Sequence, residues 1–215
     1  MSIDYKAILQ QFTSDPYYNN WMKEPFNFNG ESFGVNGYIL ACSPMIDLPE
    51  CTRPESMRGV WNITPNMRKE IDIKELEAKI WTLPTVDTYA EHLDTCSACD
   101  GDGDVTWEVD IEYRTYEREF SCPICEGTGE SMVKGEPTGK EIAKNEFIKI
   151  GTSAFDPKLI LKVLAQSKPL GESKIYLIHQ GNANAPSVFK MGEMKFLIMP
   201  RMMNVGAEYV EFELK

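Results

Sequence analysis

Apolar residues recur at helical spacing in three stretches of the chain, each following an aspartate placed to cap a helix. The strongest pattern has Pro157 directly after its aspartate, at the first helical position, where proline is favoured. Another has Glu75 three residues after its aspartate, which forms a capping-box pattern. We therefore predict short amphipathic helices over residues 3–12, 72–81 and 155–165, capped by Asp4, Asp72 and Asp156.

Other stretches alternate apolar with polar residues or are rich in β-branched and aromatic residues, as strands are. Residues 32–42 contain Asn36-Gly37, the favoured dipeptide of a two-residue hairpin turn. Residues 105–120 alternate over their whole length and predict one long hairpin. Further strands are expected at 145–150, 174–179, 188–191, 194–200 and 209–214. Helices and strands mixed in this way indicate an α+β fold.

A repeated cysteine motif flanks the long hairpin. Cys96-x-x-Cys99-x-Gly-x-Gly103 is answered by Cys122-x-x-Cys125-x-Gly-x-Gly129. A CxxC turn places two thiolates on one side of a tight knuckle, and two knuckles together supply the four sulfurs of a structural zinc site. Glycine would allow the chain to turn sharply where a Cβ would clash. We predict one structural Zn²⁺ per chain, bound by the four cysteines.

Disulfides, a redox site and coincidence are the alternatives to zinc for these cysteines. Disulfides need an oxidising compartment, and the start of the chain lacks the basic and apolar regions of a signal peptide. A thioredoxin-like redox site has one CxxC between a strand and a helix, not two beside a hairpin. Coincidence does not account for a repeated CxxCxGxG. His92 stands near the motif, but four cysteines already complete the site, and Cys42 and Cys51 lack metal-ligand spacing.

The repeated CxxCxGxG of residues 96–129 resembles the zinc-binding, cysteine-rich region of DnaJ-type chaperones. This chain has two repeats where that family has four. The family's His-Pro-Asp tripeptide is absent, because His92 and His179 are followed by Leu and Gln. The resemblance therefore implies a DnaJ-like zinc-binding hairpin and not co-chaperone activity.

Composition and charge narrow the possible functions. The chain has 215 residues, 42% of them hydrophobic, and no apolar run long enough to cross a membrane. We therefore expect a cytoplasmic protein. Its net charge of −11 is uneven: residues 96–130 hold ten acids and two bases, whereas residues 131–202 hold eleven bases and six acids. The cysteine hairpin should be repelled by phosphates, so any contact with nucleic acid should come from the rest of the chain.

The two halves of the chain resemble each other. Residues 3–9 align with residues 155–161, and each begins with an apolar residue followed by a capping aspartate. Residues 33–44 align with residues 189–200, so that Phe33 is matched to Phe189 and both segments end in proline. Each half then consists of a helix followed by a hairpin, which indicates an internal duplication.

This architecture, with residues 146–203 and 33–44, resembles the beta-type sliding clamp of bacterial DNA polymerase III. In that family each domain contains two copies of a helix-and-strands unit. Residues 155–164 match the family's final helix, and residues 185–190 and 195–202 match the strands that follow it. Asn36-Gly37-Tyr38 stands where the family's amino-terminal unit has Asp-Gly-Tyr.

The resemblance implies a DNA-clamp-like fold and a non-enzymatic function. In that family the inner helices present lysine and arginine to DNA. The matching helices here offer Lys6, Lys158 and Lys162, which are the candidate nucleic-acid-binding residues. A solvated helix face explains the same lysines equally well. The family has three domains per chain and this chain has room for one, so a ring would need about six copies. The cysteine hairpin is foreign to the family.

Motifs for catalysis are incomplete. Residues 135–140 resemble a phosphate-binding loop, but three residues instead of four separate its glycines, and Glu141 replaces the serine or threonine. The aspartates at 100, 102 and 104 begin like an EF-hand loop, but Val105 stands where glycine is needed. With two histidines there is little material for a histidine-based triad.

The sequence therefore predicts an α+β protein with a clamp-like body, residues 1–94 and 131–215, interrupted by a zinc-binding hairpin over residues 95–130. The favoured function is a non-enzymatic sliding-clamp-like protein of DNA replication or phage-type origin. Its partners would be DNA through the body, a polymerase or other protein, and other copies of itself, and no membrane. The alternative is a protein-interaction or chaperone-like adaptor that ignores DNA. An enzyme built from unmarked carboxylates is the weakest hypothesis.

Overall fold

The computed structural model describes residues 3–14, 22–52, 57, 63–202 and 209–214. The chain divides into two compact units. The body consists of Met1–Pro84 and Ile142–Lys215, and the arm consists of Thr85–Glu141. The sequence predicts a shorter insert, over residues 95–130. The observed arm is longer because β5 (Thr85–Thr95) and β8 (Glu130–Ile142) pair with each other as a two-stranded sheet.

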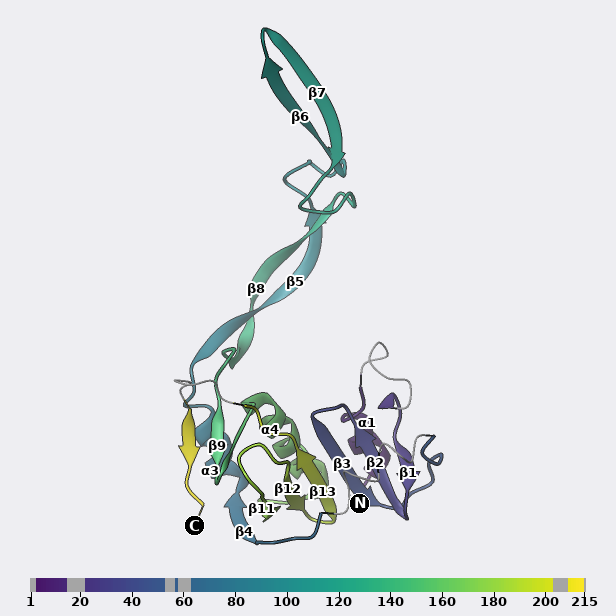
Figure 1. Ribbon diagram of the computed structural model, residues 1–215, viewed down its shortest axis with the longest axis vertical. Coiled ribbons are helices and arrows are strands. Elements are labelled where there is room, and N and C mark those ends of the chain that lie inside the picture. The colour runs from purple at the N-terminus through teal and green to yellow at the C-terminus, as the bar shows by residue number, and fades with distance from the viewer. Residues whose placement is uncertain (1–2, 15–21, 53–56, 58–62, 203–208, 215) are drawn as a thin grey trace. The chain divides into compact units, whose positions relative to one another are not determined.

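The body is built around a seven-stranded sheet in which all neighbouring strands are antiparallel (Figure 1). The predicted α+β class is confirmed. In spatial order the strands are β1 (Phe26–Phe28), β2 (Glu31–Val35), β3 (Ile39–Pro44), β13 (Met194–Ile198), β12 (Ser187–Met191), β11 (Lys174–His179) and β4 (Lys69–Asp72).

A second, smaller sheet and the helices complete the described part of the body. In the small sheet β9 lies between an antiparallel and a parallel neighbour. Its strands are β10 (Ser153–Phe155), β9 (Ile148–Ile150) and β14 (Val210–Phe212). The helices are α1 (Tyr5–Gln10), α3 (Ile73–Ile80), α4 (Pro157–Leu164) and the short α5 (Ser167–Leu170).

The three predicted helices are present with their predicted caps. The side chains of Asp4, Asp72 and Asp156 each accept a hydrogen bond from a backbone N–H in the first turn of α1, α3 and α4. Each cap satisfies a donor that the helix itself leaves without a partner. All three helices bury their apolar residues in one cluster with one face of the large sheet. That cluster is the main core of the body.

The opposite face of the large sheet carries a second, smaller core. Phe33, Leu40 and Leu197 are buried there, and Ile63 packs against them from the segment between β3 and β4. The large sheet is thus buried on both faces, which explains why β3 and β13 read as nearly continuous apolar runs.

The two halves of the body meet where β3 pairs with β13, the equivalent strands of the two hairpins β2–β3 and β12–β13. Each hairpin closes through a two-residue turn whose first central residue is a glycine with positive φ, Gly37 and Gly192. Glycine in that position suits the type II′ turn of a hairpin. The two helix-and-hairpin units therefore lie side by side in one continuous sheet.

Two details of the duplication differ from the expectation. The central residues of the first turn are Gly37 and Tyr38, and Asn36 instead accepts hydrogen bonds from the backbone of Tyr38 and Ile39. The alignment of the halves is also one residue out. Phe33 faces the same core as Val188, whereas Phe189 faces the helices, and a one-residue shift reverses every side chain of a strand.

The two body segments that flank the arm in the sequence lie close together. The backbone N–H of Ala143 donates to the carbonyl of Pro84 at 2.9 Å, so the two body segments are held together where the arm is inserted. Beyond β5 and β8, the arm contains a second ribbon formed by β6 (Asp104–Ile111) and β7 (Arg114–Ser121). This ribbon is the hairpin predicted over residues 105–120.

Asp156 tests the role of the helix caps in the body. Besides capping α4, its carboxylate lies 2.9 Å from the guanidinium of Arg201. Replacement by alanine should lower the free energy of unfolding by about 1 kcal/mol, as loss of a cap does. Asp156→Asn keeps the cap and loses the charge, so it should retain most of that stability, since exposed ion pairs contribute little. Chemical denaturation measures both; equal losses in the two variants would contradict this account.

Candidate metal centre

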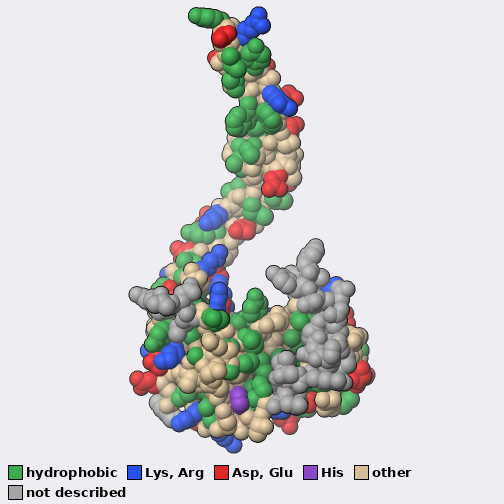
Figure 2. Space-filling view, in the orientation of Figure 1, with side chains coloured by type: hydrophobic (Ala, Val, Ile, Leu, Met, Phe, Trp, Pro, Cys, Tyr) green, Lys and Arg blue, Asp and Glu red, His purple; other side chains and the backbone are tan. Residues whose placement is uncertain are grey.

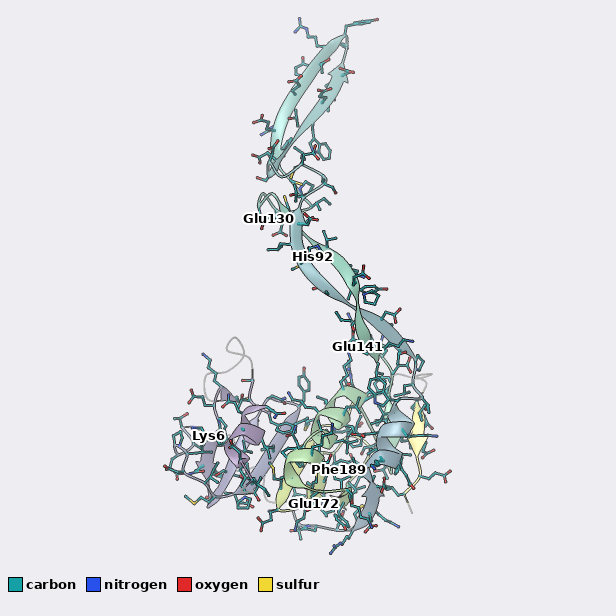
Figure 3. The ribbon with its side chains drawn as sticks, turned by 180° about the vertical axis from the view of Figure 1, so that it is seen from behind. Lys6, His92, Glu130, Glu141, Glu172 and Phe189 are labelled. Atoms are coloured by element: carbon teal, nitrogen blue, oxygen red, sulfur yellow. The ribbon has the colours of Figure 1, made fainter. Side chains whose placement is uncertain are left out.

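Two short turns in the arm bring the four predicted cysteines together. All four sulfur atoms lie within 4.8 Å of one another, and all four residues are buried. Figure 3 shows yellow sulfur atoms in the part of the arm beside Glu130. Each turn repeats the same backbone: a residue with positive φ follows the second cysteine, and the two glycines also have positive φ. The two copies of the motif therefore fold alike.

The two knuckles cross at their glycines. A Cβ on Gly129 would lie 2.3 Å from the carbonyl oxygen of Gly101, and one on Gly103 would lie 2.5 Å from that of Gly127. Backbone hydrogen bonds connect the knuckles reciprocally, from Cys96 N–H to the carbonyl of Gly129 and from Cys122 N–H to that of Gly103. The glycines are thus needed both for their left-handed backbone and for this close approach.

The sulfur positions suit a tetrahedral metal. Cys96 and Cys122 Sγ are 3.9 Å apart, and Cys99 and Cys125 Sγ are 3.7 Å apart. A tetrahedron with metal–sulfur bonds of about 2.3 Å has edges of about 3.8 Å. A disulfide needs about 2.05 Å between sulfurs, so these pairs are not disulfides, and all six cysteines are free. The cluster is compatible with a metal site of four thiolates.

Hydrogen bonds and burial give two of the thiols different acidities. Burial raises the pKa of the Cys99 thiol to about 11. Burial acts in the same direction at Cys125, but backbone N–H groups of Gly129 and Gly127 donate to its sulfur and bring its pKa down to about 7. Because a metal binds the thiolate form, protons compete with it, and metal affinity falls as the pH falls.

The remaining residues of chemical interest do not join this cluster. His92 lies along the β5–β8 ribbon (Figure 3), where a Cβ on Gly135 would be 3.4 Å from its Nδ1. His179 is part of β11, and its Nδ1 lies 2.8 Å from the carbonyl oxygen of Thr64. Cys42 is buried in the body, and burial raises its pKa. Cys51 is half-buried there.

The candidate nucleic-acid-binding lysines lie on two helices of the body. Lys6 is on α1 (Figure 3), and Lys158 and Lys162 are on α4. The ends of these helices meet, because Gln166 Nε2 donates to Gln11 Oε1 at 2.9 Å. The ammonium of Lys162 lies 5.7 Å from the ring centre of Phe12, so this lysine also contributes to packing. Lys6 and Lys158 are exposed.

One feature of the arm was not predicted from the sequence. The β6–β7 ribbon turns at Glu112-Tyr113, and both residues have positive φ. Asn-Gly is the usual choice for such a turn, because other residues are strained there. Tyr113 is fully exposed at this turn. The alternation of residues 105–120 indicated a hairpin, but only the register shows which side chains share a face.

The known proteins that this chain is similar to are found by structure alone. No protein-family model matches the chain, and no curated protein matches it either. Among solved structures, it is similar to the DNA polymerase III subunit beta from Pseudomonas aeruginosa, with 11% sequence identity and a TM-score of 0.46. That alignment covers 92% of this chain and 65% of the other chain.

Two further solved structures are of the same kind. The pol III beta of Caulobacter crescentus has 12% identity and a TM-score of 0.45, with coverage of 94% of this chain and 68% of that chain. A putative DNA polymerase III beta subunit from Eubacterium rectale has 11% identity and a TM-score of 0.45, with coverage of 94% and 64%. The chain thus spans about two thirds of the length of these three chains. Among the described helices, none has the length and apolar character needed to cross a membrane.

Gly129→Ala tests the crossing of the knuckles. The new Cβ meets a backbone carbonyl and imposes a left-handed conformation that alone costs an alanine about 1–2 kcal/mol. Metal affinity and resistance of the arm to proteolysis should both fall. Gly139→Ala, in β8 of the same arm, is the control, because its Cβ meets nothing closer than 3.6 Å. Equal metal affinity and equal resistance to proteolysis in the two variants would contradict the close approach of the two knuckles.

Cys125→Ser tests the metal centre itself. We expect mass spectrometry to detect one bound metal ion per chain in the unaltered protein and none in the variant, because serine does not supply a thiolate. Cys51→Ser is the matched control and should keep the bound metal, since Cys51 lies outside the cluster. In the unaltered protein, metal should be released as the pH is lowered below neutrality. Full metal retention by Cys125→Ser would exclude the proposed ligand set.

Proposed function

We propose that the chain is a non-enzymatic, DNA-clamp-like protein of replication or phage-type origin, whose arm is built on a structural zinc ion and contacts other proteins. The observation that carries the proposal is the paired architecture of the body. Two helix-and-hairpin units, each with an aspartate-capped helix, join edge to edge through β3 and β13. This is the arrangement implied by the resemblance noted in residues 33–44 and 146–203.

Zinc is the proposed occupant of the arm, one ion per chain, bound by Cys96, Cys99, Cys122 and Cys125. The tetrahedral fit of the sulfurs supports this choice, since four-thiolate sites of this spacing suit zinc. Its role would be structural, because four protein ligands leave no open position for a substrate. Binding of zinc to small modules contributes on the order of 10 kcal/mol to folding.

The body is the proposed DNA-contacting part. Residues 142–202 of the body hold nine bases and four acids, whereas residues 96–130 of the arm carry a strong excess of acids. Phosphate neutralisation drives binding to DNA, so the body and not the arm is suited to it. Lys6 and Lys158, exposed on α1 and α4, are the proposed contacts, and Lys162 the third. A clamp would assemble from several copies of the chain and would also contact a polymerase or other protein.

Native mass spectrometry with and without a chelator tests assembly and metal together. We expect one Zn²⁺ per chain in a closed assembly of several copies. DNA retention is then compared between Lys6→Glu/Lys158→Glu and Lys69→Glu/Lys190→Glu, which makes the same charge change on the strands β4 and β12. The helix pair should weaken retention and its salt dependence much more than the strand pair.

The opposite result would favour the adaptor hypothesis. A zinc-bearing monomer that does not retain DNA at low salt would contradict a clamp function of the body. One observation favours an adaptor: the arm has an exposed apolar surface, on which Trp107 and Tyr116 are more than half exposed.

A further inference from the structure

The β6–β7 ribbon has two chemically opposite faces. In an antiparallel pair, directly opposite residues lie on the same face, and alternate residues along each strand share it. One face is apolar apart from two arginines. Its opposed pairs are Val105 with Phe120, Trp107 with Arg118, Val109 with Tyr116, and Ile111 with Arg114. The other face pairs Asp104 with Ser121, Thr106 with Glu119, Glu108 with Glu117, and Asp110 with Thr115.

The apolar face is open to solvent. Trp107 is 60% exposed, Ile111 is 56% exposed and Tyr116 is 53% exposed. Figure 2 shows hydrophobic side chains gathered along the arm. A two-stranded ribbon has no second layer of its own with which to bury one face. A contiguous exposed apolar surface of this kind marks a site of interaction with another molecule.

The charged residues of the ribbon are divided between the same two faces. Arg114 and Arg118 are the two bases of residues 96–130, and both lie on the apolar face. The guanidinium of Arg118 lies 5.1 Å from the ring centre of Phe120, and the ring of Trp107 packs edge-on against Phe120 at 6.3 Å. These contacts hold the arginine within the aromatic surface, where its donors can meet a carboxylate. All five carboxylates of the two strands are on the other face.

We propose that the apolar face of β6–β7 docks a segment of another protein that carries both apolar or aromatic side chains and carboxylates. The apolar side chains would cover Trp107, Val109 and Tyr116, and the carboxylates would pair with Arg114 and Arg118. The inference deepens the proposed function, since it names the surface and the partner chemistry of the arm. It depends on the arm being a protein-contact element and not on the body acting as a clamp.

Charge complementarity favours this partner over two others. A second copy of the ribbon, placed face to face, would bring arginines against arginines, and like charges in an interface are unfavourable. A single-stranded nucleic acid would stack on the aromatic residues, but its phosphates would meet the field of ten acids in residues 96–130. An acidic, apolar polypeptide gains from both the aromatic surface and the arginines.

The test uses two short fluorescein-labelled peptides and the full-length, zinc-loaded chain. Both peptides carry leucine and phenylalanine at the same positions, and the intervening residues are glutamate in one and lysine in the other. Fluorescence anisotropy should show binding of the glutamate peptide, weakened by salt, and at least tenfold weaker binding of the lysine peptide.

Three variants locate the binding surface. Trp107→Ala should weaken binding of the glutamate peptide by about tenfold or more, whereas Glu117→Gln on the opposite face should leave it unchanged or slightly stronger. Arg114→Glu/Arg118→Glu should reverse the preference, so that the lysine peptide binds better. Zinc content and resistance to proteolysis show that each variant keeps a folded arm. The charge reversal removes the contact between Arg118 and Phe120 but keeps every aromatic side chain of the face.

The proposal is overturned if neither peptide binds, if both bind equally, or if the charge reversal leaves the preference unchanged. Binding of an oligothymidylate that Trp107→Ala abolishes and the glutamate peptide does not displace would assign the face to nucleic acid instead. Oligomeric state and DNA retention are measured on the same variants and should not change. Failure of the body to act as a clamp is thereby distinguished from failure of this surface.

Discussion

The antiparallel pairing of β3 with β13 is the interaction on which the body depends. It connects two hairpins from opposite ends of the chain, with Ile39 opposite Ile198 and Ala41 opposite Phe196. All four of these side chains belong to the one core that α1, α3 and α4 also enter. Neither half can bury its apolar surface without the other, so we expect the body to fold as a single cooperative unit.

The arm is stabilised in a different way. Its strands are largely exposed. The two segments that connect β5 to β6 and β7 to β8 bury the four cysteines together with Gly103 and Gly129. The arm is held together where the two knuckles cross. There, two reciprocal backbone hydrogen bonds and close glycine contacts take the place of a hydrophobic core. Local opening of the arm should therefore be governed by the cysteine knuckles more than by strand pairing.

Signals that act over a few residues could be read from the sequence, and those that act over long distances could not. The caps at Asp4, Asp72 and Asp156 and the cysteine knuckles depend on local spacing, and the structure has them as expected. The order of the strands was not predictable, because nothing near β3 specifies β13 as its neighbour.

The same distinction explains the errors. The one-residue misalignment of the halves arose because Phe33 and Phe189 are identical in type, and only their burial on opposite faces separates them. The extent of the arm was missed because β5 and β8 lack strong apolar alternation. The two-faced character of β6–β7 was accessible in principle: once the turn is placed at Glu112-Tyr113, the parity of each position assigns its face.

The hydrogen bond between Ala143 and Pro84 has a consequence for how such a protein can change. Because the body segments already meet at this point, the length and content of the inserted segment impose little on the core. The arm can therefore be lengthened, exchanged or replaced by a tight turn, in evolution or by engineering, while the body keeps its structure. The arm can then acquire a new binding specificity without any change in the fold of the body.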